Sequence, residues 1–70
     1  MNDDDKKTIM KKIDFFMDNK IKVHVKLTDY TWLNGFVSKK LRDDVYLFTE
    51  DKLGDIYLFT DSVYDIGGKR

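Results

Sequence analysis

The chain has 70 residues and balances its charges, with 13 Lys and Arg against 13 Asp and Glu. A chain this short forms one domain, here residues 1–70, whose small core usually needs support from disulfides, metals or oligomerisation. It contains no cysteine, which excludes disulfides and thiolate metal ligands. No apolar run approaches the roughly 20 residues of a membrane helix, and the first residues lack the apolar stretch of a signal peptide. We therefore expect a cytoplasmic protein without a membrane partner.

The balanced net charge hides two regions of opposite sign. Residues 21–42 carry five cations against Asp29, whereas residues 43–68 carry seven acids against Lys52. Such a distribution fits a surface that binds a polyanion, and it fits equally well two complementary surfaces that dock head to tail between copies.

The first periodic segment predicts a helix over residues 4–18. Its apolar side chains recur at spacings of three and four, and lysines and aspartates fill the opposite face. The residues of the apolar stripe are Ile9, Met10, Ile13, Phe16 and Met17. We expect this stripe to pack on a sheet rather than to bind a partner.

Residues 21–66 change to the alternation of β-strands. Residues 21–27 alternate apolar and polar side chains, residues 28–30 form a turn, and residues 31–40 form a second strand with Leu33 and Val37 on the core side. Gly35 lies between them and indicates a bend, because a glycine inside a strand has no side chain to pack. On the other side of the second strand, Trp32 offers a possible platform for a base or peptide, but we expect the helix to cover it.

The last third contains a near-repeat, in which residues 44–50 (DVYLFTE) return eleven residues later as residues 55–61 (DIYLFTD). Two copies predict a hairpin rather than a solenoid. We expect Val45, Leu47, Ile56 and Leu58 to share one face and Tyr46, Phe48, Tyr57 and Phe59 the other. One face would fill the core, and the other would need cover from the helix, another subunit or a ligand. Residues 62–66 predict a short fifth strand, and residues 67–70 a frayed tail.

One helix followed by five strands, with a bent second strand, resembles the Sm-like fold of the Sm, LSm and bacterial Hfq proteins. The residues that carry the resemblance are Val23, Val25, Leu27, Asp29, Leu33, Gly35 and Val37, with a weaker match at Ser62, Val63 and Ile66. The expected fold is thus mainly β: an N-terminal α-helix and a five-stranded, strongly bent antiparallel barrel of the Sm-like or Src-homology-3-like type, closed by the bend at Gly35.

The resemblance implies a homo-oligomeric ring of six or seven copies that binds uridine- or adenine-rich single-stranded RNA. The fourth strand of one copy would pair with the fifth strand of the next. Tyr46 stands where the family has a base-contacting Asn, and residues 59–61 stand where it has a cationic motif. The candidate RNA-binding residues are Lys39, Lys40, Arg42, Tyr46, Thr60 and Asp61. The candidate interface residues are Tyr57, Phe59, Val63 and Tyr64.

Catalysis is not expected from this sequence. The single histidine, His24, has no cluster of metal ligands around it, the serines lack a base, and no glycine-rich phosphate loop is present. We expect no metal, no cofactor and no small-molecule substrate. The alternative to an RNA-binding ring subunit is a protein-interaction or assembly module on the same barrel, which would act through its apolar Tyr57 and Phe59 face without contacting RNA.

Overall fold

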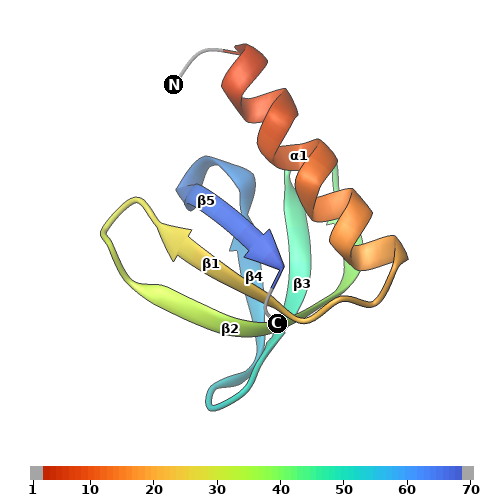
Figure 1. The fold of residues 1–70 in the computed structure, drawn as a ribbon, viewed down its shortest axis with the longest axis vertical. Helices are drawn as coiled ribbons and strands as arrows, with labels where there is room; N and C mark the ends of the chain where they lie inside the picture. The colour runs from red at the N-terminus through yellow and green to blue at the C-terminus, as the bar shows by residue number, and fades with distance from the viewer. Residues whose placement is uncertain (1–2, 69–70) are drawn as a thin grey trace.

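The computed structural model describes residues 3–68, and these form one helix and five strands (Figure 1). In chain order the elements are α1 (Asp3–Asp18), β1 (Val23–Leu27), β2 (Trp32–Arg42), β3 (Val45–Glu50), β4 (Gly54–Phe59), the short 3-10 helix η1 (Thr60–Ser62) and β5 (Val63–Gly68). The mainly β fold with an N-terminal helix is therefore confirmed. Within this described part of the chain, no helix combines the length and apolar character needed to cross a membrane.

Helix α1 packs on the sheet by the predicted stripe. Ile9 and Ile13 are buried in the core, and Phe16 and Met17 pack against its margin. Burying one such side chain contributes about 1.5–3 kcal/mol. The helix ends where the Asn19 side chain and backbone amide both donate to the Phe15 carbonyl oxygen. The observed helix begins at Asp3, one residue before the start of the helix predicted over residues 4–18.

The sheet is antiparallel and open, with the strand order β4-β3-β2-β1-β5. Strands β4 and β5 are its two edges and do not pair with each other, so the expected closure of the sheet is wrong for a single chain. Figure 1 shows β2 passing under β1 and bending toward β3, which brings the two hairpins around one core. Strand β1 begins at Val23, two residues after its predicted start.

The predicted bend at Gly35 is a point of close backbone approach. Gly35 pairs with Val23 on one side and Glu50 on the other. A Cβ atom added to Gly35 would stand 1.9 Å from the carbonyl oxygen of Thr49. Only glycine fits there, because any side chain would push β2 and β3 apart. Leu33 and Val37 are buried on either side of it, as predicted.

The prediction of which side chains share a face of the β3–β4 hairpin is wrong. The strand pairing in the structure gives a different division between the two faces. Tyr46 pairs with Leu58 and Phe48 with Ile56, and this set faces the core. Val45 pairs with Phe59 and Leu47 with Tyr57, and this set faces outward. The two copies of the repeat are offset by eleven residues, an odd number, whereas partners in this hairpin share parity. Equivalent positions of the repeat therefore lie on opposite faces of the sheet.

The end of the chain is more ordered than expected. Strand β5 continues through Gly67 and Gly68, which pair with His24 and Val23 of β1. The frayed tail predicted for residues 67–70 is therefore wrong for its first half, and residues 69–70 lie outside the described residues.

Candidate functional site

Three exposed aromatic rings surround one lysine on the outer side of β1, β2 and β5. The Lys26 ammonium lies 5.1 Å from the ring centre of Tyr30, 5.7 Å from that of Trp32 and 5.3 Å from that of Tyr64. The three residues are 69%, 53% and 57% exposed. A cation at this distance from an aromatic ring is attracted by about 0.5–1 kcal/mol at an exposed site. We call Lys26, Tyr30, Trp32 and Tyr64 the aromatic platform.

Strand pairing and one tight turn assemble the aromatic platform. Lys26 pairs with Trp32 of β2 on one side and with Asp65 of β5 on the other, which places it between the rings. In the turn, the Tyr30 amide donates to the Leu27 carbonyl oxygen over 2.9 Å. Tyr30 itself has a φ of 67°, in the left-handed region that non-glycine residues avoid at a cost of about 1–2 kcal/mol. The fold thus holds a bulky ring where a glycine would be easier to accommodate.

The carboxylates near the aromatic platform are engaged elsewhere. Asp29 accepts a hydrogen bond from the Thr31 amide over 3.0 Å, and this bond lowers the pKa of Asp29 below its ordinary value. Asp65 forms an ion pair with Lys12 of α1, with 3.5 Å between nitrogen and oxygen. Among the side chains of residues 6–68, none forms an ion pair with Lys26. Its positive charge is therefore available to an anionic ligand that approaches over the rings.

Of the sequence-predicted RNA-binding residues, Tyr46 is the one the structure contradicts most directly. Its side chain is fully buried, and its hydroxyl donates to Asp14 of α1 over 2.7 Å. Burial, followed by this bond to a carboxylate, raises the pKa of Tyr46. Lys40 lies over the ring, 5.6 Å from its centre. The stacking role expected of Tyr46 is wrong, because no base can reach its ring; it anchors α1 to the sheet instead.

The other predicted RNA-binding residues do not converge on one open site. Thr60 is buried, and its hydroxyl and amide both donate to the Asp44 carbonyl oxygen, so its predicted contact with RNA is also wrong. Asp61 is exposed and forms an ion pair with Lys6, at 3.1 Å. Lys39, Lys40 and Arg42 are exposed on the last half of β2. These cations stay accessible, but the aromatic ring that the prediction gave them, Tyr46, is buried.

A second exposed surface lies at the far end of β2. A groove of about 460 Å³ is lined by Leu41, Arg42, Val45, Tyr57 and Phe59, and we call it the outer groove. Tyr57 and Phe59 are 67% and 49% exposed. Two of the predicted interface residues therefore face solvent here, and a third, Tyr64, does so on the aromatic platform. The fourth, Val63, is fully buried, so its predicted side-chain contact with a partner is wrong.

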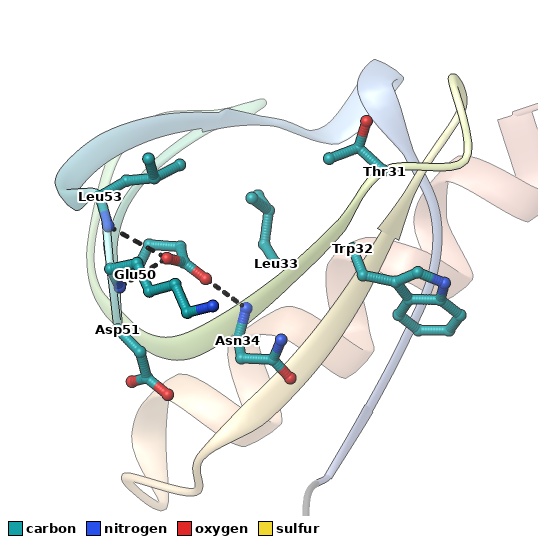
Figure 2. Close-up of a pocket in the computed structure, with 8 residues that line it drawn as sticks. Thr31, Trp32, Leu33, Asn34, Glu50, Asp51 and Leu53 are labelled. Atoms are coloured by element: carbon teal, nitrogen blue, oxygen red, sulfur yellow. Dashed lines mark hydrogen bonds between the residues drawn. The ribbon is translucent and has the colours of Figure 1, made fainter.

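A second hollow, of about 400 Å³, lies between the start of β2 and the turn that joins β3 to β4 (Figure 2). Its wall contains Glu50, whose carboxylate accepts hydrogen bonds from the amides of Asn34, Lys52 and Leu53 at 2.9, 2.7 and 3.1 Å. These bonds lower the pKa of Glu50, the one from Asn34 most strongly. Figure 2 shows Trp32 turned away from this hollow. Glu50 therefore fixes the turn, and it is not a free acid or base.

Sequence reasoning missed Tyr30, and it interpreted Lys26 as part of the solvent-facing side of the first strand without joining it to the aromatic residues. Trp32 was considered as a platform, but the helix was expected to cover it, and this expectation is wrong because α1 packs on the core side. Lys26 and Trp32 alternate outward on neighbouring strands, which is the signal that was available. Within residues 6–68, whose side chains the structure describes, no three His, Cys, Asp or Glu side chains are grouped so that they would hold a metal ion.

No protein-family model matches the chain, and no curated protein matches it either. Function therefore has to be inferred from the geometry of the described residues.

Proposed function

We propose that the chain binds single-stranded RNA on the aromatic platform. The observation that carries the proposal is one unpaired ammonium group surrounded by three exposed rings. Single-stranded nucleic acids are bound by this combination, because bases stack on aromatic faces while cations meet the phosphates. The order of the elements and the bent β2 support the Sm-like resemblance, but the site proposed here differs from the residues that the resemblance selected.

Charge and size limit the mode of binding. The chain is neutral overall, so its phosphate contacts are few and its affinity depends only weakly on salt. Three rings accommodate a few stacked bases, each worth about 1–3 kcal/mol. His24 packs against Trp32 in a T-shaped arrangement, with 5.5 Å between ring centres, and steadies the ring that the base would cover. The proposal is thus a short, stacking-dominated site with little sequence selectivity.

The test uses the single tryptophan of the chain as a reporter. Titration with uridine- and adenine-rich oligonucleotides is expected to quench the fluorescence of Trp32, because stacking places a base on its ring. Tyr30→Ala is expected to weaken binding about tenfold, and Lys26→Gln to weaken it and to reduce its salt dependence. Lys11→Gln removes the same charge from the exposed face of α1 and is the matched control.

A triple variant, Lys39→Gln with Lys40→Gln and Arg42→Gln, separates this site from the one predicted from sequence. The proposal expects little change in the Trp32 signal, since these residues lie on the other half of β2. A larger loss in the triple variant than in Lys26→Gln would move the RNA site to that end of the strand. Absence of quenching at millimolar oligonucleotide would refute RNA binding.

The second candidate is the assembly module, and it is favoured by the exposed Tyr57 and Phe59 of β4, whose outer edge has no partner strand among residues 3–68. A ring of six or seven copies would use the β4 and β5 edges. Light scattering coupled to size exclusion gives its mass directly. A monomer at high concentration would rule out the ring and leave the RNA proposal intact.

A further inference from the structure

Strand β4 is a sheet edge without the usual protection against pairing. It pairs with β3 along six residues without a register shift, and its other side has no partner strand among residues 3–68. Natural edges are normally blunted by lysine, proline or a bulge. The segment GDIYLF has none of these, and its only charged residue, Asp55, accepts a hydrogen bond from Thr49 over 2.8 Å. The edge is therefore open to another strand.

The opposite edge of the same sheet is protected. Strand β5 shifts register against β1 between Lys26 and Leu27, which marks a bulge. It also carries Asp65, paired with Lys12, and packs against α1. A second copy joined head to tail, as in the expected ring, would offer this irregular edge to β4. A second copy could also offer its own β4, but the one acidic residue of that strand, Asp55, is held by Thr49 and is not free to meet a cation. A strand from another protein is therefore the better partner for β4.

The outer groove lies on the outward face of β2, β3 and β4, with the edge strand β4 as one of its walls, and it contains one charge. Tyr57 and Phe59 point out from β4 at alternate positions, and Leu41 and Val45 complete an apolar wall. Arg42 lines the same groove and has no carboxylate partner among the described residues. A guanidinium group against apolar walls forms strong paired hydrogen bonds with a carboxylate. The groove is complementary to an apolar strand with an acidic side chain.

We infer that β4 and the outer groove bind an extended segment of a partner protein, which adds to the sheet as a sixth strand. The main chain of the segment pairs with the edge of β4, and alternate apolar side chains enter the groove. One carboxylate of the segment meets Arg42. The segment is otherwise neutral, because residues 43–68 carry seven acids against Lys52 and repel a strongly acidic partner. This inference goes beyond RNA binding and does not depend on it.

The experiment uses the full chain, labelled with nitrogen-15, and a blocked peptide of about eight residues, the length of an ordinary strand. Valine and threonine alternate in the peptide, and one central valine is replaced by glutamate. Addition of the peptide is expected to shift the amide resonances of β4. A twin peptide with lysine in place of the glutamate is expected to bind about tenfold more weakly. Arg42→Glu is expected to reverse this preference.

Two surface variants and a mass measurement decide among the occupants. Tyr57→Lys places a charge on the edge and is expected to reduce peptide binding about tenfold, whereas Phe15→Lys, on the exposed face of α1, is expected to leave it unchanged. Equal binding of the two peptides, or shifts confined to residues outside β4 and the groove, would overturn the inference. So would light scattering that shows a defined oligomer disrupted by Tyr57→Lys, because the occupant would then be a second copy.

Discussion

The two ends of strand β2 carry exposed aromatic surfaces that differ in what they leave unsatisfied. At the first end, Trp32 and its neighbours surround the ammonium of Lys26, and the rings themselves are the open feature. At the last end, Arg42 lies among apolar side chains in a groove of which the edge strand β4 forms one wall, and the open features are a guanidinium and a backbone edge. The first arrangement suits flat, stacking ligands, and the second suits an extended chain. Exposed aromatic residues alone do not distinguish these two kinds of site.

The largest effect on stability is expected from Gly35→Ala, which places a side chain at the bend between the two ends of β2. The new Cβ would meet the Thr49 carbonyl oxygen at 1.9 Å, so β2 and β3 must move apart. We expect the free energy of unfolding to fall by about 3 kcal/mol or more, which is a large part of the stability of a domain this small. Urea denaturation followed by circular dichroism measures it.

Gly54→Ala is the matched control for this prediction. Gly54 has a φ of 77° but open space where a Cβ would stand, so only the backbone conformation is penalised, by about 1 kcal/mol. If both variants lose the same stability, the close approach of β2 and β3 is not what requires glycine at position 35.

An intermediate effect is expected from Tyr46→Phe, which tests whether Tyr46 acts through the fold. The variant removes the hydrogen bond to Asp14 and is expected to cost about 1–2 kcal/mol of unfolding free energy. Because the ring is buried, RNA and peptide affinities should not change. A loss of RNA affinity with unaltered stability would instead return Tyr46 to the RNA site predicted from sequence, through a contact of its hydroxyl. Thermal denaturation and Trp32 fluorescence provide the two readouts.

A smaller effect on stability, but a clear one on binding, is expected from Tyr30→Gly. Glycine relieves the left-handed backbone at this position by about 1 kcal/mol, and loss of the contact with Lys26 offsets part of that gain. The net change in unfolding free energy should be near zero, while RNA affinity falls about tenfold. Tyr30→Asn, which also tolerates this conformation, should behave alike. Peptide binding at the outer groove should be unaffected, which separates the two surfaces.

The smallest expected effect on stability concerns Glu50 and is seen only at acidic pH. Its pKa is lowered in the folded chain, so its carboxylate stabilises the fold fully above the ordinary glutamate value of 4.5. This contribution is lost as the pH falls through the lower folded pKa. Stability measured from pH 6 down to about pH 3 should therefore fall more steeply in the wild type than in Glu50→Gln. Parallel curves would mean that the bonds to the turn amides do not depend on the charge.

Sequence periodicity was enough to predict the helix and the strands, but not to predict which side chains form the exposed surfaces. The spacing of Ile9 and Ile13 predicted the helix, and the alternation around Val23 and Val25 predicted a half-buried strand, because both patterns reflect local geometry. The hairpin faces depended on the length of the turn, which no periodicity reveals. The repeat suggested that equivalent residues of its two copies share one face of the sheet. The hairpin pairs the two strands in opposite directions, and the odd offset between the copies places equivalent residues on opposite faces.

The candidate site was harder to predict because it draws on three separate segments. Lys26, Tyr30 and Tyr64 come from a strand, a turn and the last strand, and only the pairing of β1 with both β2 and β5 joins them. Tyr46 was misjudged for the opposite reason: a tyrosine near cations fits a binding site, and the carboxylate that takes its hydroxyl lies 32 residues away on the helix.

The hydrogen bonds of Glu50 have a consequence for how the hairpin keeps its alignment. Strand β4 is apolar on both sides, so burial alone distinguishes poorly between its two orientations. One additional residue in the turn would rotate the strand by half a turn and exchange the inner Ile56 and Leu58 for Tyr57 and Phe59. The carboxylate of Glu50 binds the amides of Lys52 and Leu53 and thereby sets the number of residues that the turn contains. The Glu50 side chain thus favours the alignment in which Tyr57 and Phe59 face outward.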